Sequence, residues 1–281
     1  MTKDGMSHPL RDSQQDIEAA EHRADMAQTR ASAYRLAFAD DDFLTRPETR
    51  PIRLQLELMK PELIMAEREI MSTIVLFGGA RIPEPAARAR ARTPTLAGLS
   101  HYYDVAREFA RIMTLRSLAS GGKEDVIVTG GGPGVMEAGN RGAQDAGGAS
   151  IGLNVVLPHE QEPNPYVTPE LCFNFHYFAV RKMHFLMRAR AIAVFPGGFG
   201  TMDELFEALT LIQTRRMAAL PFLLFGEDFW RRIINWDALA EAGTISQADL
   251  GLFRFVETAE DAVAAIDSWV PPEPVGGPIP T

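Results

Sequence analysis

Two glycine-rich turns, each set between a short apolar run and an amphipathic segment, constrain the fold of this chain more than any other feature. Residues 191–195 (AIAVF) are too few and too rich in β-forming residues for a helix, so they indicate a buried parallel strand. The run PGGFGT follows at 196–201, and Leu205, Ala208 and Ile212 then recur at helical spacing. These glycines therefore lie in a strand-to-helix turn.

The second glycine turn is at 129–134 (TGGGPG), directly after the apolar run DVIV at 125–128. A helix is expected over 135–146, because Gly147-Gly148 supplies a C-terminal stop. The turn fits the dinucleotide fingerprint G-x-G-x-x-G only loosely, and no acidic residue ends a clear next strand to bind an adenosine ribose. Alone, this turn is weak evidence for nucleotide binding, but two such turns in one sheet favour it.

A strand-to-helix turn of this kind suits an anion, phosphate above all, because free backbone N–H groups and the positive end of a helix dipole point to one spot. Glu204, just after the turn at 196–201, has two interpretations. In the first, it forms a capping box with Thr201 as the N-cap residue. In the second, its carboxylate faces a ligand group beyond the phosphate, such as ribose hydroxyls or a water. The two are compatible if Thr201 caps the helix while Glu204 turns outward.

The rest of the chain repeats the alternation of strand and helix. Further strands are expected at 73–77, 151–157, 171–175, 221–225 and 252–256, and further helices at 99–116, 179–190 and 259–269. This order predicts an α/β fold with a Rossmann-like, doubly wound, mainly parallel sheet that has helices on both faces.

We divide the chain into three parts. Residues 1–70 form an N-terminal extension, disordered to about residue 15 and then helical over 14–35 and 54–71. Residues 71–270 form a Rossmann-like nucleotide-binding catalytic domain, and the proline- and glycine-rich residues 271–281 form a disordered tail. We expect the extension to pack on the core domain or at a subunit interface.

Composition excludes several classes of protein. A net charge of −9 without a basic stripe argues against nucleic-acid binding, and no apolar run approaches the 18 residues of a membrane span. The N-terminus lacks a signal-peptide core, and the one cysteine, Cys172, lies in an apolar run, so we expect a cytoplasmic protein without internal disulfides. The six histidines show no metal-ligand spacing, and no metal is expected.

Arg181 and Lys182 begin the helix that precedes residues 191–195, where a cation opposes the helix dipole and indicates an anionic partner. Together with PGGFGTMDE at 196–204, they resemble the R-K…P-G-G-x-G-T-x-x-E signature of the LOG ("Lonely guy") family. Its members are cytokinin riboside 5′-monophosphate phosphoribohydrolases, often labelled lysine decarboxylases. The likeness covers roughly residues 70–265, and the extension resembles the longer, type II members, which tend to form higher oligomers than the dimeric short ones.

The resemblance implies hydrolysis of the N-glycosidic bond of a nucleoside 5′-monophosphate, which yields the free base and ribose 5-phosphate. Arg181 and Glu204 match the catalytic pair of the family. The positions that match substrate contacts are Lys182, Gly197, Gly198, Phe199, Gly200, Thr201 and Thr210. Gly131 and Gly132, in the other glycine turn, belong to the same likeness and are also expected to bind substrate. In this scheme the turn holds the phosphate, Glu204 orients or activates water, and Arg181 balances charge and positions the ribose.

The sequence departs from that of short family members in two places, both near the position where the base of the nucleotide is expected to bind. Gly78-Gly79-Ala80-Arg81 stands where they carry a C-G-S-S type turn, and Met183-His184 follows the Arg-Lys pair rather than preceding it. AMP and an N6-substituted AMP (a cytokinin nucleotide) therefore both remain open as substrate.

Two other functions compete with hydrolysis. A non-catalytic nucleotide or molybdenum-cofactor carrier has a similar fold and similar glycine turns. A pyridoxal-phosphate decarboxylase needs a Schiff-base lysine with an acidic partner for the pyridine nitrogen, and Lys182 is a poor candidate. We therefore expect no cofactor.

The two motif helices carry more apolar residues than one face of a sheet needs. These residues are Phe178, Phe185, Phe206 and Leu211. Their pattern, and the family resemblance, predict a homodimer or higher homo-oligomer in which the partner completes each site.

Overall fold

The structure is a computed structural model that describes residues 12–158 and 162–271. The chain separates into two compact units, one holding the described residues up to Leu56 and the other beginning at Glu57. Disorder was predicted to about residue 15 and over 271–281; residues 1–11 and 272–281 lie outside the described residues, as does the centre of the polar loop at 159–161. At residues 13–15 the prediction is wrong, because α1 begins at Ser13.

The N-terminal unit consists of short helices. They are α1 (Ser13–Glu21), α2 (Ala27–Arg30), α3 (Asp41–Leu44) and the first turns of α4 (Arg50–Glu67), with 3-10 turns between them. The helical structure predicted over 14–35 is present only in pieces, because α1 ends at Glu21 and α2 spans only four residues. Of the described residues in this unit, only Asp40 and Thr49 are buried. Asp40 caps α3 by accepting a hydrogen bond from the Phe43 N–H at 3.3 Å.

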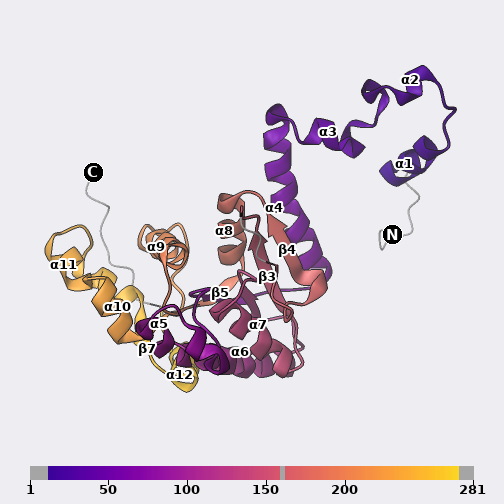
Figure 1. The fold of residues 1–281 in the computed structure, drawn as a ribbon. Helices are drawn as coiled ribbons and strands as arrows, with labels where there is room; N and C mark the ends of the chain where they lie inside the picture. Colours follow the sequence, from indigo (N-terminus) through magenta and orange to yellow (C-terminus); the bar gives the residue numbers. More distant parts are fainter. Residues whose placement is uncertain (1–11, 159–161, 272–281) are drawn as a thin grey trace. The chain divides into compact units, whose positions relative to one another are not determined.

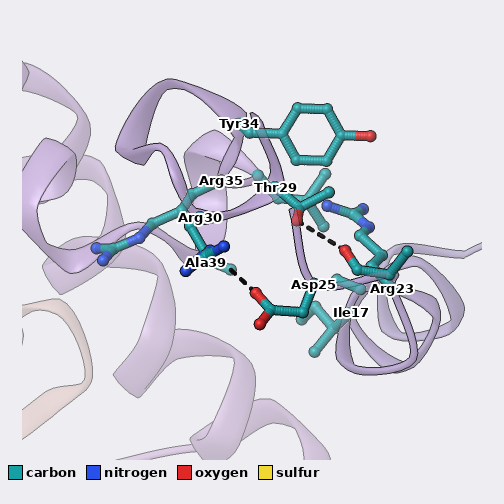
Figure 2. A pocket seen from close by; sticks show the side chains of 11 residues that line it. Ile17, Arg23, Asp25, Thr29, Arg30, Tyr34, Arg35 and Ala39 are labelled. Carbon is teal, nitrogen blue, oxygen red and sulfur yellow. Dashed lines mark hydrogen bonds and ion pairs between the residues drawn. The ribbon is translucent and has the colours of Figure 1, made fainter. Parts of the chain in front are cut away.

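This unit has a hollow of about 330 Å³ between α1, α2 and the turns that follow. Figure 2 shows the side chains that line it. Hydrogen bonds and ion pairs hold its wall: the Thr29 hydroxyl donates to the Ala24 carbonyl at 2.8 Å, and Arg30 pairs with Asp25 at 3.0 Å. Both side chains of this ion pair are mostly exposed, so it contributes little to the stability of the unit.

The second unit is built on one sheet of seven parallel strands, in the order β4-β3-β2-β1-β5-β6-β7. Of these strands, Figure 1 labels β3, β4, β5 and β7. The strands are β1 (Thr73–Phe77), β2 (Val126–Thr129), β3 (Ser150–Val155), β4 (Cys172–Phe175), β5 (Ala189–Val194), β6 (Phe222–Phe225) and β7 (Arg254–Val256). All seven were predicted, with their ends within two residues. The mainly parallel, doubly wound sheet is therefore confirmed.

Helices cover both faces of the sheet. Ile74 and Leu76 of β1 belong to the core beneath α6 (His101–Ala119), α7 (Val135–Asp145) and α12 (Ala259–Asp267). On the opposite face, Phe77 meets Phe185 of α8 (Phe178–Met187) edge to face, with ring centroids 4.9 Å apart. The next helix, α9 (Phe199–Gln213), contacts β1 as well. The short helices α5 (Pro94–Gly98), α10 (Glu227–Ile233) and α11 (Trp236–Glu241) were not predicted, because none is long enough to show a helical period.

The chain order reverses between β1 and β5. Successive strands add on one side as far as β4, and the chain then returns to place β5 on the other side of β1. Ligands bind open α/β sheets at the carboxyl ends of the strands beside such a switch. The turns there interlock, because Gly79 N–H donates to the Pro196 carbonyl at 2.9 Å and Val135 N–H donates to the Gly79 carbonyl at 3.3 Å. In the described residues, no helix is both long and apolar enough to cross a bilayer.

Candidate active site

A cavity of about 760 Å³ lies at this switch point, a size typical of small-molecule sites. Its wall comes from the turns after β1, β2 and β5, from the end of β3, and from α8 and α9. The lining residues from the predicted site are Gly132, Arg181, Gly197, Gly198, Phe199, Gly200, Thr201 and Glu204. The fold therefore brings both glycine turns and both predicted catalytic residues to one cavity.

Arg181 and Glu204 form an ion pair in the cavity wall, with 3.2 Å between Arg181 Nη1 and Glu204 Oε1. Their side chains are only 10% and 14% exposed. Arg181 Nε also donates to the Leu153 carbonyl at 2.7 Å, and its guanidinium lies over the Phe185 ring, 4.9 Å from the centroid. The end of β3 and the ring of Phe185 thus fix the guanidinium before any ligand binds.

Burial raises the pKa of Glu204 to about 7, although the positive charge of Arg181 lowers it. A carboxyl group with a pKa near the working pH is well matched to general acid–base catalysis. The capping-box interpretation of Glu204 is wrong, because the N-cap residue of α9 is Gly198 rather than Thr201 and no side chain caps this helix. Glu204 instead contacts Arg181 and lines the cavity, and the second interpretation, in which its carboxylate faces a ligand group, stays a prediction.

The turn before α9 is shaped to bring backbone close to a ligand. A Cβ atom at Gly197 would lie 2.2 Å from Thr201 Oγ1, so only glycine fits there. The first N–H groups of a helix have no partner within the helix, and a 15-residue helix adds its dipole to them. Because this turn and the first residues of α9 line the cavity, they form a candidate anion site.

In the turn after β2, the residues that line the cavity differ from those that were predicted. Gly130, which was not predicted, lines the cavity and makes room for Arg181, because a Cβ there would lie 2.6 Å from Arg181 Nη2. Gly132 also lines the cavity, but Gly131 does not: its N–H donates to Thr129 Oγ1 at 2.9 Å. Gly131 therefore has a structural role in this turn, because its φ is +71° and a Cβ there would lie 2.5 Å from Asn154 Oδ1, and its contact with substrate stays a prediction.

A buried polar network holds this turn from below. Asn164 Nδ2 donates to the Gly132 carbonyl at 3.0 Å and to Asn140 Oδ1 at 2.9 Å. Asn140 Oδ1 also accepts the Thr129 hydroxyl at 2.7 Å. Sequence reasoning missed the network because its members lie far apart in the chain. A polar residue at a buried helical position, Asn140, was the only available signal.

Two other predicted substrate contacts lie outside the cavity. The Lys182 ammonium is 3.0 Å from Asp203 and 2.8 Å from Glu207, so it ties α8 to α9. Thr210 lies on the exposed face of α9, and its hydroxyl donates to the Phe206 carbonyl at 2.6 Å. Neither residue lines the cavity of its own chain.

Helix α8, which carries Arg181, receives its N-terminal cap from a distant residue. Tyr177, its own N-cap residue, makes no capping hydrogen bond through its side chain. The Glu57 carboxylate on α4 accepts the N–H of His176 at 2.8 Å and the N–H of Tyr177 at 3.1 Å. These contacts place a negative charge at the positive end of the helix. No pattern in the sequence could have revealed a cap more than 100 residues away.

Replacing Glu57 by alanine is expected to lower the free energy of unfolding by about 1–2 kcal/mol, the usual cost of losing an N-cap. Urea denaturation measures this loss. Glu57→Gln keeps one acceptor oxygen and should lose less. Glu67, near the end of the same helix, is exposed and makes none of the described hydrogen bonds, so Glu67→Ala is the control. Equal stability of the Glu57→Ala and Glu67→Ala proteins would contradict the capping role.

The chain is similar to known proteins. A family model described as "Possible lysine decarboxylase" matches residues 136–266. The rice (Oryza sativa subsp. japonica) protein named probable cytokinin riboside 5′-monophosphate phosphoribohydrolase LOGL5 is 26% identical over 53% of this chain and 60% of its own length. The Arabidopsis thaliana cytokinin riboside 5′-monophosphate phosphoribohydrolase LOG4 is 24% identical over 61% of this chain and 77% of its own.

Two solved structures are also similar. The molybdenum cofactor binding protein of Rippkaea orientalis aligns with 18% identity and a TM-score of 0.47 over 70% of this chain and 96% of that one. The Moco carrier protein of Chlamydomonas reinhardtii aligns with 18% identity and a TM-score of 0.44, over 70% and 95%.

Proposed function

Because the chain is a relative of the LOG family, as its sequence predicts, we propose that it hydrolyses the N-glycosidic bond of a nucleoside 5′-monophosphate. The products are the free base and ribose 5-phosphate. The observation that carries the proposal is the ion pair of Arg181 and Glu204, held in the same cavity as an uncapped helix N-terminus. A phosphate and a reacting sugar need these two elements side by side.

In the proposed reaction, the N–H groups at the start of α9 bind the 5′-phosphate. The bond between C1′ and the base nitrogen breaks as positive charge develops on the ribose, and water adds to C1′. The carboxylate of Glu204 stabilises that charge and takes the proton of the water, while Arg181 keeps part of the Glu204 population ionised. No other carboxyl group lines the cavity among the described residues, so we assign protonation of the departing base to solvent water.

The base would lie against the apolar part of the wall. Leu96, Leu99 and Phe229 line the cavity there, and their aliphatic and aromatic surface suits a purine or an apolar N6 substituent. The names of the plant relatives point to cytokinin nucleotides. We therefore propose AMP or an N6-substituted AMP as the substrate.

The test is incubation of the purified protein with AMP and with isopentenyladenosine monophosphate, with free base followed by chromatography. We expect base release, and the ratio of the two rates ranks the substrates. Tight binding of both nucleotides without release of base would contradict hydrolysis and would favour the non-catalytic carrier function.

We also propose that the protein is a homodimer or higher homo-oligomer through α8 and α9. Their outer faces expose Phe178, Met183, Met187, Phe199 and Phe206, of which Phe199 is 93% exposed. Phe178 and Phe199 also line the cavity, so a partner covering this face would close it. Phe185, which the sequence analysis assigned to this surface, is instead buried against the sheet. Thr210 lies on the same exposed side of α9, from which it would reach the site of a partner.

Introducing a charge into this face is expected to separate the subunits. We expect wild-type protein to scatter light with a mass of at least twice the 31.0 kDa of the chain, and Phe206→Asp to give the monomer mass. Leu115→Asp is the control, because Leu115 is 45% exposed on α6, across the sheet. A monomeric wild type at micromolar concentration, or a Phe206→Asp protein with unchanged mass, would contradict the proposal.

A further inference from the structure

Three charged side chains line the cavity in the described part of the chain: Arg81, Arg181 and Glu204. The charges of Arg181 and Glu204 oppose each other at 3.2 Å. No acidic residue that the structure describes lies within ion-pair distance of Arg81, whose side chain is exposed. The cavity wall therefore carries one uncompensated positive charge, and Arg81 supplies it.

The backbone around Arg81 is fixed beside the candidate anion site. Gly79, two residues earlier, donates its N–H to the Pro196 carbonyl of the turn that begins α9. Ile82, the next residue, donates its N–H to the Gly79 carbonyl at 3.3 Å and is only 2% exposed. The start of α7 is joined to the same carbonyl through the Val135 N–H. Arg81 thus extends from a well-anchored turn whose neighbours are the two glycine turns of the site.

A phosphate monoester brings close to two negative charges into the cavity. The N–H groups of α9 offer partial charges, and the full charge of Arg181 is already opposed by Glu204. A guanidinium matches the oxygens of a phosphate with two parallel N–H···O bonds. We propose that Arg81 binds the 5′-phosphate together with the first turn of α9, and that it makes the site prefer nucleoside monophosphates to nucleosides. This inference rests on the function proposed above.

Binding of ribose 5-phosphate tests the role of Arg81 without turnover, because this compound is a product. Isothermal calorimetry would compare the wild-type chain with Arg81→Gln and Arg81→Lys, after thermal melting has shown equal stability. We expect Kd to rise about 10- to 100-fold in Arg81→Gln, as for loss of a hydrogen-bonded charge, and less in Arg81→Lys. Arg88→Gln is the matched control, because Arg88 is exposed in the segment that follows and does not line the cavity. Its Kd should be unchanged.

Kinetics then separate a phosphate contact from a contact with the rest of the nucleotide. In Arg81→Gln, kcat/KM for AMP should fall by a similar factor, and the rate of adenosine hydrolysis should fall much less. Equal loss for AMP and adenosine, or unchanged binding of ribose 5-phosphate, would overturn the inference while leaving the hydrolase proposal intact. Wild-type protein that binds ribose 5-phosphate through Arg81 but releases no base would overturn the hydrolase proposal alone.

Discussion

Replacing Glu204 by glutamine is expected to lower kcat for nucleotide hydrolysis by about 10³-fold, within the range of general acid–base catalysis. Glutamine has the same shape and retains an oxygen that can accept the Arg181 N–H, now 3.2 Å from the carboxylate. It can neither take a proton from water nor stabilise a positive ribose with a full charge. Because no second carboxyl group lines the cavity among the described residues, no neighbour can replace it. Steady-state release of base measures the effect.

Glu207→Gln is the matched control for this loss. Glu207 lies three residues further along α9, pairs with Lys182 and does not line the cavity. We expect this variant to keep at least about a third of the wild-type rate, because it removes one surface ion pair of small free energy. A Glu204→Gln protein that retains more than a tenth of the wild-type rate would exclude Glu204 as the catalytic base.

The sequence predicted the strands and helices whose formation depends on residues close together in the chain. Short apolar runs located all seven strands, and their alternation with helical segments implied a parallel sheet. Glycine turns after β2 and β5 marked the edge of the sheet at which the cavity lies. The N-terminal region was less predictable, because its composition favours helix while few of its side chains are buried, so no apolar period fixes where each helix ends.

In the candidate site, only residues that lie in the family signature could be predicted from the sequence. Arg181 and Glu204 lie in the family signature and line the cavity together. The partners that hold them come from elsewhere: the Leu153 carbonyl on β3 fixes Arg181, and Glu57 on α4 caps its helix. Lys182 shows the converse, because it lies in the signature but its charge is directed to α9 rather than to the cavity. Such contacts depend on the packing of distant segments, which no local pattern encodes.

Replacing Arg181 by methionine is expected to lower kcat/KM for AMP at least about 100-fold at neutral pH, as for loss of a group that stabilises charge in the transition state. Part of this loss comes through Glu204. The charge of Arg181 lowers the pKa of Glu204, so its removal raises that pKa above about 7 and leaves less of the active carboxylate. The wild-type rate should rise as pH increases through about 7, and the variant should show this rise at higher pH. The variant's deficit should therefore shrink as the solution becomes more alkaline.

Asp203, an acidic residue on α9, provides a control that should shift the pH profile in the opposite direction. Asp203 raises the pKa of Glu204 through its negative charge, and it does not line the cavity. Asp203→Asn should therefore move the rise in rate to lower pH, whereas Arg181→Met moves it to higher pH. Loss of a substrate contact alone would lower the rate equally at every pH and leave the midpoint of the profile in place. Shifts in opposite directions for the two variants would show that Arg181 acts on the ionisation of Glu204 as well as on the nucleotide. An unchanged midpoint of the pH profile in both variants would contradict this effect of Arg181 on Glu204.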